Sequence, residues 1–241
     1  MLQFLTRGLE SVSSILFPPH CAACSETLPS GFNLFCENCL MGLSLLEAEG
    51  RCHRCFCPRE GHDSCGFCRE LPRGLRQQAV CFEESPISHQ LLSLLSKGIA
   101  TTAVAGYLVL QMERLRWPLP DLVVPTPGDW FDTNERWEVR KLLAKEVARI
   151  LNRPYAHCTK TNRYLFPIRH ESLEAQPHFT SPIVLCSSSE AINRVVLIIH
   201  DEYKTGNAIS LTAKSLKDAG AQALYALSLV AESTSPLIEM D

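Results

Sequence analysis

Hydrophobic residues recur every three or four positions in three parts of the chain, which predicts amphipathic helices. The first covers residues 2–16 and ends before a proline pair. The second covers 87–116, either as one helix or as two helices broken at Gly98. The third covers 134–151, with its apolar residues on one face and several lysines and arginines on another.

Residues 121–125 read as a short buried strand, and the continuous apolar run at 195–199 is typical of a central strand in a parallel sheet. This run leads into a loop at 200–207, a helix at 208–219 and a further strand at 223–230. Such a strand–helix–strand unit is parallel because its crossover helix returns the chain to the same end of the sheet. We therefore expect an α/β fold with a doubly wound parallel sheet.

The chain has 241 residues, 46% of them hydrophobic, which is enough to build a core without cross-links. Its unusual feature is 12 cysteines, nine of which fall between Cys21 and Cys68. The start of the chain lacks the pattern of a secretion signal, and no apolar stretch reaches membrane-spanning length. We expect a cytoplasmic protein with no membrane insertion, where clustered thiols serve as metal ligands more often than as disulfides.

The clustered cysteines form four Cys-x-x-Cys pairs, a spacing at which one turn presents two thiolates to one ion. We predict an N-terminal module of zinc-ribbon type over residues 1–73, holding one or two structural zinc ions. The spacing leaves open whether adjacent pairs share an ion or interleave, and Cys57, His20, His53 and His62 are spare ligands. The predicted ligands are Cys21, Cys24, Cys36, Cys39, Cys52, Cys55, Cys65 and Cys68.

The loop at 200–207 carries the candidate chemistry, because ligands of doubly wound sheets bind at the carboxyl ends of strands. Its Thr-Gly end suits a phosphate, which would meet a hydroxyl, a bare backbone and the N–H groups of a helix N-terminus. Its acidic end suits ribose hydroxyls or Mg²⁺. The alternative is a helix cap with solvent-facing acids. Asp201 and Glu202 are the candidate catalytic residues, and the candidate ligand-binding residues are Asp201, Glu202, Lys204, Thr205, Gly206, Asn207 and Ala208.

Over nearly its full length the chain resembles the ComF family, whose members join a cysteine-rich zinc module to a phosphoribosyltransferase-like domain. The matching features are Leu16-Phe-Pro-Pro-His-Cys-Ala-Ala-Cys24, the paired Cys-x-x-Cys motifs, Lys97-Gly98, Val124-Pro-Thr-Pro127 and the loop at 200–208. The resemblance implies a phosphoribosyltransferase-like domain over 74–241 that binds phosphoribosyl diphosphate with Mg²⁺. It also implies a role in handling single-stranded DNA during natural transformation, with competence proteins such as a helicase as partners.

The loop departs from the usual pattern of phosphoribosyltransferases, which has two acids, a hydrophobic residue, a variable residue and then Thr-Thr-Gly-x-Thr. Aligned on Gly206 without gaps, the first acid becomes His200 and the hydrophobic residue becomes Glu202. The first threonine becomes Lys204 and the last becomes Ala208. Two alternatives therefore stay open: a catalytically inactive zinc-containing adaptor that keeps the fold, and a nucleobase salvage phosphoribosyltransferase.

The formal net charge of −3 argues against a uniformly basic nucleic-acid binder, but the charge is unevenly placed. Residues 136–169 hold nine lysines and arginines against two glutamates, a net +7, whereas residues 1–73 are acidic. Such a basic segment suits nucleic-acid phosphates, although it also suits the solvent face of a helix. The predicted nucleic-acid contacts are Arg136, Arg140, Lys141, Lys145, Arg163 and Arg169.

Overall fold

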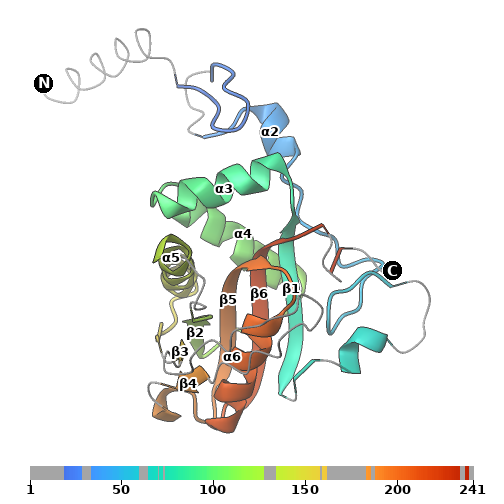
Figure 1. Ribbon diagram of the computed structural model, residues 1–241, viewed down its shortest axis with the longest axis vertical. Helices are drawn as coiled ribbons and strands as arrows, with labels where there is room; N and C mark the ends of the chain where they lie inside the picture. Colours follow the sequence, from blue (N-terminus) through green and yellow to red (C-terminus); the bar gives the residue numbers. More distant parts are fainter. Residues whose placement is uncertain are drawn as a thin grey trace, which may run out of the picture.

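A four-stranded parallel sheet forms the centre of the computed structural model, in the order β1-β6-β5-β2 (Figure 1). The strands are β1 (Leu75–Glu83), β2 (Leu122–Pro125), β5 (Val195–Tyr203) and β6 (Ala223–Ala231). The central strands β5 and β6 are buried almost throughout, which explains their continuous apolar runs. The predicted parallel α/β sheet is thus confirmed.

The structure describes residues 19–28, 34–59, 65–69, 71–72, 74–127, 134–157, 159–161, 183–185, 188–233 and 237–238. The predicted helix at 2–16 lies outside these residues. Two short strands, β3 (Thr159–Thr161) and β4 (Ile183–Leu185), pair antiparallel. In the described part of the chain, no helix has the length and apolar character needed to cross a membrane.

Helices cover the two faces of the sheet. The longer ones are α3 (Pro86–Ser96), α4 (Thr101–Arg114), α5 (Asn134–Ile150) and α6 (Asn207–Asp218). The shorter ones are α2 (Glu37–Met41) and the 3₁₀ turns η1 (Gly66–Arg69) and η2 (Ser188–Glu190). The chain crosses from β1 to β2 through α3 and α4, and from β5 to β6 through α6 in the opposite direction. Right-handed crossovers of opposite direction place α4 and α6 on opposite faces (Figure 1).

The helix predicted over 87–116 is a pair, as one of the two expectations had it, and Gly98 between them takes a φ of +71°. The predicted loop at 200–207 is wrong over its first four residues, because β5 continues to Tyr203. Those residues stay in parallel register with β6, with His200 beside Ser228 and Tyr203 beside Ala231. The strand β1 was not predicted, since its sequence mixes polar and apolar residues.

After β2 the chain runs away from β5, toward the outer edge of the sheet. After α5 it runs beside β2, where the Val123 N–H donates to the Pro154 carbonyl (3.0 Å) and the Ala156 N–H donates to the Val123 carbonyl (3.1 Å). The chain therefore leaves β2 toward the outer edge of the sheet and leaves β5 toward β6. The order of the strands reverses between β2 and β5, and this is where doubly wound sheets bind ligands.

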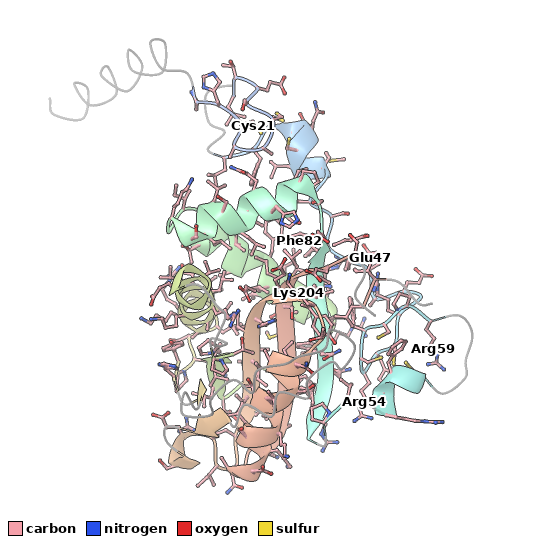
Figure 2. The ribbon with its side chains drawn as sticks, viewed as in Figure 1. Cys21, Glu47, Arg54, Arg59, Phe82 and Lys204 are labelled. Atoms are coloured by element: carbon pink, nitrogen blue, oxygen red, sulfur yellow. The ribbon has the colours of Figure 1, made fainter. Side chains whose placement is uncertain are left out.

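The two cysteine-rich segments contact different parts of the sheet domain. Cys21 lies near α2 at the upper end of the molecule, whereas Arg54 lies beside β1 and Arg59 lies farther out on the same side (Figure 2). The first segment approaches α3, since a Cβ added at Gly42 would lie 2.7 Å from Ile87. The second is hydrogen-bonded to β1, where the Gln78 N–H donates to the Arg54 carbonyl (2.9 Å). A domain boundary after residue 73 stays a prediction.

Candidate functional site

The eight predicted zinc ligands form two clusters, and within each cluster the Sγ atoms lie within 4.8 Å of one another. The first cluster is Cys21, Cys24, Cys36 and Cys39, and the second is Cys52, Cys55, Cys65 and Cys68. Adjacent Cys-x-x-Cys pairs therefore share a cluster, which decides the question that the spacing left open. Among the described residues, the spare ligands Cys57, His20 and His53 belong to neither group of four.

The sulfur positions fit tetrahedral zinc. Four thiolates at about 2.3 Å from one ion are separated by about 3.8 Å. The Sγ atoms of Cys24 and Cys36 lie 3.6 Å apart, and those of Cys52 and Cys68 lie 3.4 Å apart. The Cys36 N–H also donates to the Cys21 sulfur (3.3 Å). These clusters could each hold one zinc ion with no open coordination position, which is the arrangement of structural sites.

The thiols of each cluster do not ionise equally without a metal. Burial opposes ionisation of Cys21, but hydrogen bonds from the Cys24 and Cys36 backbone lower its pKa to about 6. Burial and the neighbouring sulfurs instead raise the pKa of Cys39 to about 12. In the second cluster the pKa of Cys52 is similarly lowered to about 7, against burial, by backbone hydrogen bonds. Because one thiolate discourages the next, a bound cation is what would keep all four ionised.

The carboxyl ends of β2 and β5 are joined by two buried side chains. The hydroxyl Oγ1 of Thr126, directly after β2, lies 2.7 Å from Nδ1 of His200 on β5. His200 occupies the place where the phosphoribosyltransferase pattern has its first acid. An imidazole therefore stands between the two strands at the point where their order reverses.

Asp201, the next residue of β5, forms a buried ion pair with Arg140 of α5. The Arg140 Nε donates to Asp201 Oδ1 (2.6 Å) and Nη1 donates to the Pro127 carbonyl (2.9 Å). Burial opposes ionisation of Asp201, but the neighbouring His200 and Arg140 outweigh it and lower the pKa of the carboxyl. Arg140 was predicted to contact nucleic acid, but in the structure its guanidinium is buried against Asp201 and does not lie on the surface.

Glu202 has other partners than Asp201. Its carboxylate instead lies within 4.8 Å of donor atoms of Glu84 and His89, and 3.9 Å from the Lys204 ammonium. Glu84 Oε1 and His89 Nε2 lie within hydrogen-bond distance of each other, at 2.8 Å. The two predicted catalytic acids are thus adjacent in sequence but do not converge on one ligand.

This arrangement does not fit Mg²⁺ at the position of the two acids in the phosphoribosyltransferase pattern. Magnesium requires carboxylate oxygens that face the ligand and share the ion with its phosphates. Here His200 replaces one acid, Arg140 engages Asp201, and Glu202 lies among other partners. The positive charge that a metal would bring to Asp201 is already supplied by Arg140.

The segment after β5 is the exposed part of the site. Thr205 and Asn207 are exposed, and Gly206 has a φ of +74°, a conformation that favours glycine. Gly206 is the N-cap residue of α6, and no side chain caps this end of the helix. The first N–H groups of α6 therefore have no side-chain acceptor at the N-cap and face the loop. Lys204 forms an ion pair with Glu232, which offsets its charge. The loop can therefore offer mainly neutral N–H donors to an anion.

The remaining predicted nucleic-acid residues lie in or beyond α5. Lys141 pairs with Glu138 (2.5 Å), and the Lys145 ammonium lies 5.6 Å from the centre of the Tyr155 ring. Arg163 and Arg169 fall outside the described residues, as does the side chain of Arg136. Nucleic-acid binding by these residues stays a prediction.

No protein-family model matches the sequence, and the curated proteins contain no match to it. Among solved structures, an adenine phosphoribosyltransferase from Thermoanaerobacter pseudethanolicus is 16% identical with a TM-score of 0.39, over 57% of this chain and 83% of that one. A glutamine phosphoribosylpyrophosphate amidotransferase from B. subtilis is 15% identical with a TM-score of 0.38, over 54% of this chain. An allosteric regulatory enzyme of purine biosynthesis is 15% identical with a TM-score of 0.39, also over 54%.

The matched part covers only about a quarter of the last two proteins (26% and 25%). Similarity at this level does not indicate an activity, so the candidate site is defined by its own geometry. That geometry is the reversal of strand order between β2 and β5, the Thr126–His200 contact and the open end of α6.

Proposed function

We propose that this chain is a zinc-containing, phosphoribosyltransferase-like protein that binds a 5-phosphoribosyl group at the carboxyl ends of β2 and β5. The observation that carries the proposal is the placement of the open α6 N-terminus at the reversal point of the sheet. A reversal point supplies the crevice, and a helix N-terminus beginning at a bare glycine supplies the anion site.

The phosphate would lie against the N–H groups that begin α6, with the Thr205 hydroxyl beside it. These groups have no partner within the helix, and the helix dipole favours an anion there. A ribose attached to that phosphate would extend over the ends of β2 and β5, where Thr126 and His200 lie. The two tetracysteine clusters would hold structural zinc and take no part in the chemistry.

We further propose that this binding does not depend on Mg²⁺ and that the chain acts as a binding protein. Transfer of a phosphoribosyl group requires a diphosphate leaving group neutralised by metal and cations. The Arg140–Asp201 pair and the divergence of Glu202 speak against such a centre here. These contacts favour the adaptor over the salvage enzyme. A role with single-stranded DNA and a helicase partner stays a prediction from the ComF resemblance.

Calorimetric titration with ribose 5-phosphate and with ribose tests the proposal. Heat with the phosphate ester and none with ribose is expected, because the loop recognises the phosphate. Asn207→Asp adds a negative charge at the first residue of α6, which should stabilise the helix by about 0.3–1 kcal/mol while weakening phosphate binding. Asn152→Asp makes the same change at an exposed residue in the turn after α5. There the new charge lies at the C-terminal end of a helix dipole, so it should lower stability slightly and leave phosphate binding unchanged. Equal binding of ribose and its phosphate would sink the proposal.

A further inference from the structure

One buried side chain connects the second tetracysteine cluster to the loop before α6. The Gln78 Nε2 of β1 donates to the carbonyl of the zinc-ligand candidate Cys55 (3.1 Å) and also lies 3.3 Å from the Tyr203 hydroxyl. Gln78 is 4% exposed and Tyr203 is 6% exposed, so water does not compete for these contacts. We propose that Gln78 is a positioning residue through which zinc at the second cluster holds the phosphate loop in place.

At the loop end of this connection, the Tyr203 side chain packs closely against the backbone of Gly206. A Cβ added at Gly206 would lie 2.5 Å from the Tyr203 hydroxyl oxygen and 3.0 Å from Cζ of the same ring. The end of the Tyr203 side chain therefore packs closely against the backbone that starts α6. Because Gln78 hydrogen-bonds the Tyr203 hydroxyl, it would also help to hold this backbone in position.

The metal side of the connection is the turn that holds Cys52 and Cys55. Zinc would fix the backbone of such a turn, whereas a metal-free turn is free to rearrange. The turn lies along β1, where the Gln78 N–H donates to the Arg54 carbonyl (2.9 Å). Gln77 makes a comparable side-chain bond to the His53 carbonyl (2.8 Å). Within the described residues, the Gln77 side chain hydrogen-bonds no part of the loop, so the two glutamines differ in what they connect.

Among the described residues, no hydrogen bond links a residue between Cys21 and Gly42 to β1 or to the loop, and this segment approaches α3 instead. Loss of zinc from the second cluster should therefore loosen the loop, and loss of zinc from the first should not. This inference rests on the zinc and phosphate assignments proposed above. Its readout is the mobility of the loop without any ligand, so its failure can be told apart from failure of phosphate binding.

Hydrogen exchange of the backbone amides over residues 203–210 tests the metal dependence. Cys65→Ser should remove one zinc ion and speed exchange of these amides about fivefold, as expected for loss of one hydrogen bond. Cys36→Ser should also remove one zinc ion but leave their exchange unchanged. Equal exchange in the two variants would overturn the inference.

Substitution of Gln78 tests the route itself. Gln78→Met, with both zinc ions retained, should speed exchange of the same amides to a similar extent, and Gln77→Met should not. Adding Cys65→Ser to Gln78→Met should have little further effect on the loop. Tyr203→Phe tests the connection from its other end if Gln78→Met does not fold, because it removes the hydroxyl and keeps the ring. Equal exchange in Gln77→Met and Gln78→Met, or normal exchange in Tyr203→Phe, would contradict the route.

Discussion

Arg140 Nε lies 2.6 Å from Asp201 Oδ1, and both side chains are only 4% exposed. The pair connects α5 to β5 at the point where the strand order reverses. Burying two charges costs desolvation, so the intact pair is no large net source of stability. It matters because it neutralises the Asp201 carboxylate, which could otherwise face a metal ion.

Removing one partner of the Arg140–Asp201 pair should strongly lower the stability of the folded protein. Arg140→Met should lower the free energy of unfolding by about 3–5 kcal/mol, because it leaves Asp201 buried without its counter-ion. The double variant Arg140→Met/Asp201→Leu should recover a large part of that loss. Arg149→Met, which breaks the pair of the 65% exposed Arg149 with Glu146, should cost about 1 kcal/mol or less. Urea unfolding of all four proteins measures this, and a double variant that recovers none of the loss in Arg140→Met would contradict the coupling.

The same pair should make stability depend on acid pH. The pKa of Asp201 is lowered in the folded protein from its ordinary value of 3.8. Its contribution is therefore fully present above that value and is lost as pH falls below it toward the folded pKa. The difference in unfolding free energy between wild type and Asp201→Asn should shrink as the pH falls below about 4. Metal loss in acid affects both proteins, so the difference isolates Asp201. A difference that does not change with pH would count against the ion pair.

Zinc content should follow the two clusters. The wild-type protein should contain two zinc ions per chain, and Cys36→Ser and Cys65→Ser should each contain one. Cys81→Ala should still contain two, because this buried thiol lies in β1 outside both clusters and burial raises its pKa. Elemental analysis of the purified proteins measures the ratio. Loss of both ions from either single variant would show that the clusters do not bind independently.

Gly206 should be needed for ligand binding in a way that other left-handed glycines are not. Gly206→Ala should weaken ribose 5-phosphate binding by about tenfold or more, since its Cβ would displace the Tyr203 ring or the loop. Gly98→Ala has nearly the same φ (+71° against +74°) but no atom within 4 Å of the new Cβ. Gly98→Ala should therefore introduce backbone strain without a steric clash, and the affinity for ribose 5-phosphate should stay unchanged. Calorimetric titration of both variants compares them, and equal affinities would count against the loop as the phosphate site.

Much of the fold could be predicted from the sequence, because apolar spacing determines which elements can be buried. The runs at 121–125 and 195–199 and the helices on either side of Gly98 lie where the pattern places them. The strand β1 was missed because its Gln78 is polar yet buried, and its amide is satisfied by the Cys55 carbonyl. That partner is distant in sequence, so no local pattern reveals it.

The site was predicted less completely, for a similar reason. The position of the loop and the eight cysteines could be predicted from motif spacing. The roles of the charged residues could not, since Arg140 and Asp201 are 61 positions apart and pair only when α5 packs on β5. On a helical pattern Arg140 looks like one more surface cation. Asp201 and Glu202 likewise look like a pair, although they have different partners in the structure.

The central claim is that this site binds a phosphoribosyl group without magnesium. Its most direct test is calorimetric titration with phosphoribosyl diphosphate, with and without added Mg²⁺, in buffer without a chelator so that zinc is retained. We predict saturable binding in both cases, with dissociation constants that agree within about twofold. Binding that requires Mg²⁺, or is tightened by it about tenfold or more, would contradict the account.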